Sequence, residues 1–499
     1  MNKVINRIWE FWWVGILLII APCLIKAKVP DSDTFFLIAT GKNIVETGMV
    51  PTINPFVIHE EFSMIVQQWL FDVIIYSVYN AFSNSGIFVF VLAAYTMSIT
   101  LLYKYLSLFS QNKIAKGIIM LICGFLYISF GVARPTCISF IVMIFLLYCI
   151  EKYRKTNKLI YLVFLPILSL LEINIHSAMW PMIFVLMLPY VFPYTLIQKG
   201  YIKVKTKQWF NRNKYLLLIM PIMMVMGLIN PNGIKGITYI INSYGSANNG
   251  LSILELLPPN TNSLMGIIIM IAIAFFSIYL YKNKTKLLDS SNDIQNEFAK
   301  LSLAAGVLIL ACTHLRNAWY LIIGTTPIIL TVIGDFKIKC KKARSITTFR
   351  KIEFTAIAMV LTIFFSYFML SISSFSAITT KDSELAPIKA AEYLEKYEKK
   401  DIILYTEFNN GAYMELQGYK VYIDARPELF EKKINGKEDV YTEYCKVKKG
   451  DADFEKFLNK YKFTHMIVLD NTLLELYLSL SDEYVPMVCG TGYTLYELK

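Results

Sequence analysis

Two carboxylates that lie two residues apart, Asp31 and Asp33, are the side chains whose position most directly suggests chemistry. They follow the apolar run over residues 11–25 after a few residues, which places them at a membrane surface. A carboxylate held there can remove a proton or bind a cation, and two can divide these roles, so Asp31 and Asp33 are also the candidate ligands of a divalent cation. The alternative is that they cap a helix that begins near Thr34, where negative charge is favourable.

Two arginines, Arg134 and Arg316, interrupt apolar sequence in segments where positive charge is otherwise scarce. The planar guanidinium group can bind a phosphate through paired N–H donors. We favour Arg316 for this role because His314 lies beside it. The alternatives are contact with lipid headgroups and a structural ion pair with Glu172 or Asp33.

Further polar residues lie in short connections between apolar runs. Asn174 and His176 are candidates for substrate binding, and Glu172 lies four residues before His176, on the same face of a helix if the helix extends that far. A histidine paired with this carboxylate is favoured over a metal site, because the spacing is not that of a zinc site. Glu255, in a later connection, is another candidate. His59 lies beside two glutamates and is expected to be a solvated loop residue.

A membrane domain must position these residues. The sequence has 499 residues, of which 56% are apolar, and a mean hydropathy of +0.48. Long apolar runs separated by basic segments indicate a multi-pass α-helical membrane protein. We place eleven spans near residues 9–27, 84–103, 114–132, 135–151, 158–173, 177–198, 214–229, 264–282, 298–313, 318–334 and 352–374.

The segment 67–82 is apolar over only about 14 residues and contains Asp72, so it is too short and too polar to cross a bilayer that needs about 20. We predict a helix that lies in the membrane interface. With this assignment, 26 Lys and Arg residues fall on one side of the membrane and six on the other before the C-terminal region. The positive-inside rule then makes the N-terminus cytoplasmic. The net charge of +12 is therefore a topology signal and an attraction to membrane lipid, and nucleic acid is not expected as a partner.

From about Lys381 the pattern changes to that of a water-soluble α/β domain. It predicts helices over 386–399 and 453–461, strands over 402–406, 420–424 and 466–470, and a further helix and strand pair that leads to 493–498. We therefore expect a transmembrane domain over 1–380, with the first extracytoplasmic loop at 28–83, and an extracytoplasmic domain over 381–499. Cys445 and Cys489 both lie in this second domain and could form a disulfide.

The combination of an Asp-x-Asp after the first span, an interfacial helix, about eleven spans and an outward C-terminal domain resembles the GT-C membrane glycosyltransferases. More closely, the chain resembles a group of bacterial membrane proteins near GT-C that share a set of short motifs. In this sequence those motifs read Asp31-Ser-Asp33, Thr40-Gly41, Asn54-Pro55-Phe56, Gln68-Trp69-Leu70, Arg134-Pro135, Asn174-Ile-His176, Asn230-Pro231-Asn-Gly233 and Asp424-Ala425-Arg426. Three positions depart from the group's pattern: Leu37 replaces a His, Gln68 a Glu and Asn54 an Asp.

The resemblance implies a glycosyltransferase in the bacterial plasma membrane. It would transfer a sugar from a polyprenyl-phosphate donor, at the extracytoplasmic face, to a glycan, lipid or protein acceptor. Asp31 or Asp33 would be the catalytic base or metal ligand. The residues expected to contact substrate are Arg134, Asn174, His176, Glu255, His314 and Arg316. The alternative keeps the fold without the reaction, as a lipid-linked glycan transporter or assembly factor.

Overall fold

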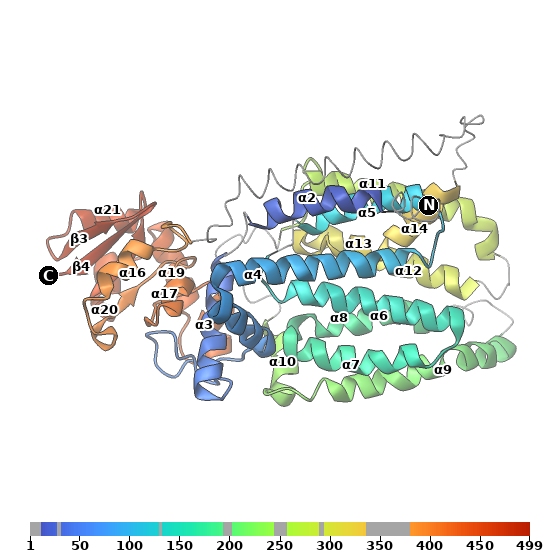
Figure 1. The fold of residues 1–499 in the computed structure, drawn as a ribbon. Helices are drawn as coiled ribbons and strands as arrows, with labels where there is room; N and C mark the ends of the chain where they lie inside the picture. The colour runs from blue at the N-terminus through green and yellow to red at the C-terminus, as the bar shows by residue number, and fades with distance from the viewer. Residues whose placement is uncertain are drawn as a thin grey trace, which may run out of the picture.

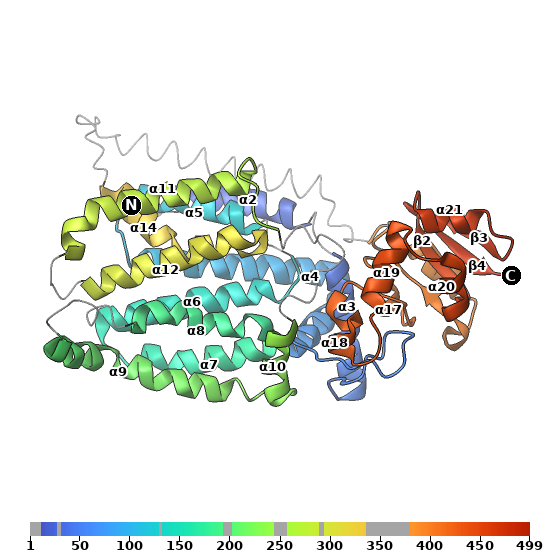
Figure 2. The ribbon, with the colours of Figure 1, turned by 180° about the vertical axis from the view of Figure 1, so that it is seen from behind.

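A computed structural model describes residues 11–26, 31–128, 132–192, 202–243, 257–288, 294–335 and 380–499. Its helices run alongside one another in a bundle, and a smaller α/β domain lies beyond one end of that bundle (Figures 1 and 2). Helix α3 lies between the bundle and the smaller domain in both views. We call this end of the bundle the α3 end.

Every span predicted before residue 336 overlaps a helix within its described residues, whereas the predicted span over 352–374 lies outside the described residues. The helices of this part are α2 (Trp12–Lys26), α3 (Ser32–Thr47), α4 (Trp69–Leu106), α5 (Lys113–Ile128), α6 (Thr136–Thr156), α7 (Ile160–Ile175), η1 (Ser177–Met179), α8 (Trp180–Val191), α9 (Ile202–Met226), α10 (Gly233–Ser243), α11 (Leu264–Leu288), α12 (Ile294–Thr313), η5 (Leu315–Asn317), α13 (Tyr320–Gly324) and α14 (Thr326–Asp335).

Several of these helices are long and apolar enough to cross a membrane. Four meet that requirement singly, within α4, α6, α11 and α12, and a fifth is obtained if the bent pair Leu315–Gly324 and Thr326–Gly334 counts as one span. Shorter apolar helices lie at Trp12–Pro22, Ile160–Ile175, Ser177–Val191 and Asn213–Met226. The chain therefore has the helices of a multi-pass membrane protein, and the number eleven stays a prediction.

Helix α4 is broken where the predicted interfacial helix meets the predicted span. Ser83 has φ 52° and ψ −152°, which is not a helical conformation. A residue with a side chain rarely adopts such a positive φ, so Ser83 interrupts the helix. The two parts of α4, Trp69 to Phe82 and Asn84 to Leu106, can thus run in different directions. The placement of the first part in the interface remains a prediction.

Helix α3 has clear signals at both ends. Asp31 is its N-cap and accepts a hydrogen bond from the Thr34 backbone N–H. Gly48, in the left-handed conformation with φ 71°, ends it and donates its N–H to the Ile44 carbonyl. The residues from Thr34 to Gly41 are all buried, which is unusual for a helix outside a bundle. They are covered because α4 and the C-terminal domain enclose α3.

The C-terminal domain contains a four-stranded mixed sheet in the order β1-β2-β4-β3. Strand β1 (Leu404–Tyr405) is parallel to β2 (His465–Leu469), and β4 (Tyr493–Leu498) is antiparallel to both β2 and β3 (Tyr484–Cys489). The helices of this domain are α16 (Ile388–Leu394), η6 (Lys399–Asp401), α17 (Gly411–Leu416), η7 (Pro427–Phe430), α18 (Lys432–Asn435), α19 (Val440–Lys449), α20 (Phe454–Tyr461) and α21 (Leu473–Ser479). The helices and the mixed sheet of this domain agree with the α/β pattern of the sequence.

One expectation for this domain is wrong, and a disulfide that the sequence left possible does not form. The segment 420–424 is not a regular strand: only Val421 forms bridges, one to Leu404 of β1 and one to Val57 of the first loop. The apolar residues around Val421 are buried because they join the domain to the loop, and the same pattern would arise in a strand. Cys445 and Cys489 form no disulfide, since Cys445 is buried and free and Cys489 is exposed and free.

The C-terminal domain is attached to the first loop (residues 28–83) by backbone hydrogen bonds. The Val421 N–H donates to the Phe56 carbonyl at 2.9 Å, and the Ile58 N–H donates to the Val421 carbonyl at 3.0 Å. An exposed ion pair, Lys437 with Glu61 at 2.8 Å, lies nearby. A two-way backbone pairing of this kind fixes the loop in register with the domain.

His59 lies inside this contact, so the expectation of a solvated residue is wrong. Its Nε2 atom lies 2.8 Å from the Tyr422 carbonyl oxygen. Its ring stacks on Phe62, with 4.8 Å between ring centroids, and meets Phe430 and Tyr461 edge-on. Burial lowers the pKa of His59 below its ordinary value. The burial of His59 could not be predicted from local sequence, because the rings of Phe430 and Tyr461 come from residues more than 360 positions away.

Candidate active site

Asp31, Asp33 and Arg134 come together at the α3 end of the bundle. Arg134 donates from Nε and from Nη2 to Asp31 Oδ2, each at 2.9 Å, and its Nη1 lies 3.0 Å from Asp33 Oδ2. The side chains are 29%, 19% and 26% exposed for Arg134, Asp31 and Asp33, so water reaches all three. One guanidinium faces two carboxylates, and the group therefore keeps one formal negative charge at neutral pH.

The local structure explains how the two acids differ. Asp31 Oδ1 accepts from the Thr34 N–H at 3.0 Å and from the Thr34 hydroxyl. Both oxygens of Asp31 are therefore occupied, one by the helix cap and one by Arg134. Asp33 lies in the first turn of α3 and is not its cap. The capping interpretation of the sequence is thus correct for Asp31, whereas Asp33 is not the cap.

Arg134 is fixed by the start of α6. Its carbonyl accepts the Cys137 N–H at 3.0 Å and its own N–H donates to the Val132 carbonyl at 2.8 Å. Pro135 follows it directly and lies at the N-terminal boundary of the helix, where proline is well tolerated. The Arg-Pro pair thus starts α6 and directs the arginine side chain towards the N-terminus of α3.

The two acids do not present a ready cation site. Both oxygens of Asp31 and one oxygen of Asp33 are already in contact with donors, and a cation would have to displace the Arg134 guanidinium. Within the described ranges, no group of three or more His, Cys, Asp or Glu side chains could hold a metal ion. The donor set therefore does not fit a bound metal, and we derive no step through one.

His176 is joined to α6 through a side chain that sequence inspection missed. Its Nδ1 lies 2.8 Å from the Ser139 hydroxyl, so the expected partner Glu172 does not hold the ring. Instead the Glu172 backbone carbonyl accepts the His176 N–H at 2.7 Å. Burial and the nearby charge of Arg316 lower the pKa of His176 to about 3, which keeps the imidazole neutral at physiological pH. No sequence signal marks Ser139, since serine is common in membrane helices.

Asn174 is used to hold the first loop. Trp69 Nε1 donates to Asn174 Oδ1 at 2.8 Å, and Asn174 Nδ2 donates to the Ile229 carbonyl at 2.9 Å. Next to it the Ser177 N–H donates to the Gln67 carbonyl at 3.0 Å. These bonds leave Asn174 only 7% exposed. Asn174 therefore supports the chain around Trp69, and its contact with substrate stays a prediction.

The Asn-Pro-x-Gly motif has a similar structural role. Asn232 Nδ2 donates to the Val66 carbonyl at 3.0 Å, and Asn230 turns the chain by bonding the Asn232 N–H at 2.9 Å. Gly233 has φ 52°, a conformation that favours glycine. The motif thus fixes the segment of the first loop just before Trp69.

Arg316 lies in η5 and is exposed. It has no ion pair or hydrogen bond to a residue in the described part of the chain, although its charge acts on His176. His314 precedes η5 and is partly buried. Glu255 lies outside the described residues. The structure therefore brings Asp31, Asp33 and Arg134 into contact, and places His176 and Arg316 within electrostatic reach of each other.

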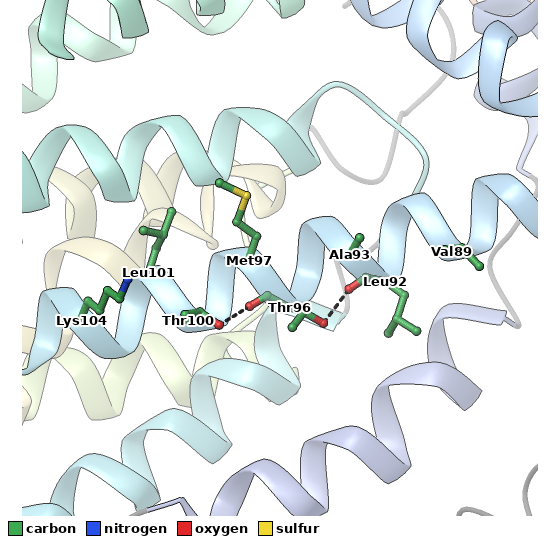
Figure 3. Close-up of a pocket in the computed structure, with 8 residues that line it drawn as sticks. All are labelled: Val89, Leu92, Ala93, Thr96, Met97, Thr100, Leu101 and Lys104. Atoms are coloured by element: carbon green, nitrogen blue, oxygen red, sulfur yellow. Dashed lines mark hydrogen bonds between the residues drawn. The ribbon is translucent and has the colours of Figure 1, made fainter.

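A surface groove lies elsewhere, along one face of α4 (Figure 3). It measures about 590 Å³ and is lined from Val89 to Lys104, with none of the predicted site residues in it. The hydroxyls of Thr96 and Thr100 are bonded to carbonyls one turn earlier, at 2.8 Å each. The groove is therefore an apolar surface of a membrane-spanning helix and no part of the acid site.

Comparison with known proteins supports the fold. No protein-family model matches the sequence, and no curated protein matches it. The structure resembles the oligosaccharyltransferase of Archaeoglobus fulgidus in its apo form, with a TM-score of 0.54 and 11% identity over 92% of this chain and 70% of that one. It also resembles the oligosaccharyltransferase AglB of the same organism in complex with an inhibitory peptide and a dolichol-phosphate, with a TM-score of 0.52, 12% identity and coverage of 92% and 69%.

A third similar structure is the same archaeal enzyme tethered to an acceptor peptide, with a TM-score of 0.52 and 11% identity. At these identities the likeness establishes the fold alone. The chain therefore has a GT-C-like fold, as the sequence resemblance implied. Its reaction has to be argued from the site.

Proposed function

We propose that this chain is a membrane glycosyltransferase that takes a sugar from a polyprenyl-phosphate-linked donor at the extracytoplasmic face. The acceptor would be a glycan, lipid or protein. The observation that carries the proposal is the Asp31–Arg134–Asp33 group, which is partly water-accessible and keeps one negative charge. The GT-C-like fold, with this group at its α3 end, supports the proposal.

We assign the role of general base to Asp33. As the acceptor hydroxyl oxygen forms its bond to the sugar C1 carbon, its proton passes to Asp33, and the C1–O bond to phosphate breaks. The phosphate leaves with the electron pair. Asp33 suits this role because its loss would leave the cap of α3 in place, whereas Asp31 is that cap. Arg134 orients the acid through its contact with Asp33 Oδ2.

Arg316 is the group we assign to the donor phosphate. It is an exposed cation without an ion-pair or hydrogen-bond partner among the described residues. A guanidinium binds a phosphate through two parallel N–H donors. Arg134, in contrast, donates to two carboxylates. We therefore assign the phosphate to Arg316 alone and not to both arginines.

The proposal requires the α3 end to face outward. Basic residues support this orientation, since Lys155 donates to the Leu108 carbonyl and Lys300 lies over the Phe109 ring at the opposite end of α4. We expect a cysteine at Met49, which is 71% exposed, to be labelled from outside intact cells. A cysteine at Lys158 should be labelled only after permeabilisation, and outside labelling there would contradict the orientation.

The function itself is tested with purified protein in lipid nanodiscs and radiolabelled polyprenyl-phosphate sugars. Membrane extract supplies the acceptor. We expect label to move from the donor to an acceptor fraction, with release of polyprenyl phosphate. Binding of the donor without any transfer, across donors that carry different sugars, would contradict the proposal and favour the non-catalytic transporter.

A further inference from the structure

A buried ion cluster lies in the C-terminal domain where it meets α3. Arg426 Nη2 binds Glu415 Oε1 at 2.8 Å and Oε2 at 2.9 Å. It also binds Asp424 Oδ2 at 2.6 Å, and Arg426 Nε donates to Asp424 Oδ1 at 2.9 Å. The side chain of Arg426 is 7% exposed, and those of Glu415 and Asp424 are fully buried. These bonds hold the plane of the guanidinium in one orientation.

The guanidinium faces two aromatic rings of the first loop. Its central carbon lies 4.9 Å from the ring centroid of Phe36 and 5.7 Å from that of Phe56. Phe36 belongs to α3 and follows Asp33 by three residues, which is nearly one helical turn. A guanidinium at such a distance from an aromatic ring is attracted to it, and more strongly when water is excluded.

Further contacts restrict α3 from two directions. Phe35 meets the ring of Tyr413 of α17 edge-on, with 5.2 Å between centroids. On another side, Gly41 lies so close to α4 that an added Cβ would stand 2.0 Å from the Asp72 carbonyl oxygen. The C-terminal domain and α4 therefore both constrain the position of α3. Figures 1 and 2 show α17 beside α3 from both directions.

We infer that Arg426 is a positioning residue: by holding Phe36, it fixes α3 so that Asp33 reaches the reacting hydroxyl. The inference rests on the proposed function. It gives the Asp424-Ala-Arg426 motif a role in turnover without any contact with substrate. A shift of about 1 Å in a reacting group can cost on the order of 100-fold in rate, so a small movement of α3 is sufficient.

Phe36→Leu is the direct test. Leucine fills much of the same apolar space but lacks the ring that Arg426 faces. Glu61→Gln is the matched control, because it breaks the exposed pair with Lys437 between the same two parts of the chain without touching α3. Hydrogen exchange of the α3 amides reports how firmly the helix is held, since exchange follows local opening. Transfer kinetics report its consequence.

We expect the α3 amides of Phe36→Leu to exchange several-fold faster than those of the parent and of Glu61→Gln. We also expect kcat to fall by about 10- to 100-fold while the KM for the donor changes little, because Arg316 is unaffected. Unchanged exchange, or unchanged kcat with faster exchange, would overturn the inference. Faster exchange in a chain whose parent transfers no sugar would instead reject the proposed function and leave the positioning of α3 intact.

Arg426→Lys keeps the test valid if Phe36→Leu does not reach the membrane. Lysine preserves the charge that Glu415 and Asp424 require, and it lacks the planar group that lies against Phe36. Faster α3 exchange with lower kcat in this variant supports the inference. Parent-like values for both quantities would overturn it.

Discussion

At the scale of single residues, Arg134 determines what the two acids can do. It contacts both, and it leaves Asp31 with no free oxygen because Thr34 occupies the other one. Two acids with the same sequence context thus have different chemistry. The difference arises because Asp31 is the N-cap of α3, whereas Asp33 lies in the first turn of that helix.

Arg316 gives a prediction at the same scale. Arg316→Ala should raise the KM for the donor by about 10- to 100-fold, because a hydrogen bond to a charged group is worth about 1.5–3 kcal/mol. The kcat at saturation should change little if the phosphate contact is equal in the ground and transition states. Lys42→Ala is the control, an exposed cation on α3 with only a 4.0 Å contact to Glu46. Equal KM values for the two variants would reject the assignment of Arg316.

At the scale of elements, the close approach of α3 and α4 depends on Gly41. An added Cβ there meets backbone atoms of Asp72, which cannot move aside as a side chain can. We expect Gly41→Ala to lower the free energy of unfolding by about 1–3 kcal/mol. Gly306→Ala, in α12, is the control: nothing lies within 4 Å of its added Cβ, and the change should be neutral or stabilising by up to about 1 kcal/mol. Thermal unfolding in detergent measures both, and equal results would show that the two helices are further apart.

The elements themselves could be predicted well where local patterns decide them. The predicted spans before residue 336 all overlap helices in the described part of the chain. The segment that contains Asp72 is separated from the span after it by the break at Ser83. The segment 420–424 was wrongly predicted as a strand, because burial of Val421 arises from contact with the first loop rather than from a sheet.

The site could also be predicted in part, because some of its residues are marked by local sequence patterns. Acids next to a span and an arginine in an apolar setting are visible in the sequence, and the pairing of Arg134 with Asp33 was one of the alternatives it offered. The Ser139–His176 contact, the structural use of Asn174 and the cover over His59 depend on distant segments meeting. No local pattern encodes such meetings.

At the scale of the whole molecule, the contact between the C-terminal domain and the first loop should depend on pH through His59. Burial lowers its pKa in the folded chain, so above about pH 6.5 it is neutral both folded and unfolded. As the pH falls below that value the unfolded form takes up a proton first, and stability is lost. Glu438 and Glu443 favour the charged form of His59, whereas Lys460 opposes it.

We therefore expect thermal stability to fall between pH 7 and pH 5.5, and His59→Gln to weaken this dependence. One such group contributes at most about 1.4 kcal/mol per pH unit. Burial raises the pKa of Glu428, so this carboxyl group has the opposite effect on stability to His59. Its contribution to stability is lost as the pH rises above about 4.5. The comparison is accordingly between the variant and the parent at each pH. An unchanged dependence in His59→Gln would exclude His59 as its source.

The central claim is that Asp33 is the base of a sugar transfer, and Asp33→Asn measures it most directly. Asparagine keeps the size and removes the charge, so loss of a general base should lower kcat by about 10²- to 10⁴-fold at matched membrane abundance. Asp31→Asn should retain the cap of α3, because asparagine caps helices about as well as aspartate, and should keep substantially more activity. An Asp33→Asn enzyme within a few fold of the parent would contradict the claim.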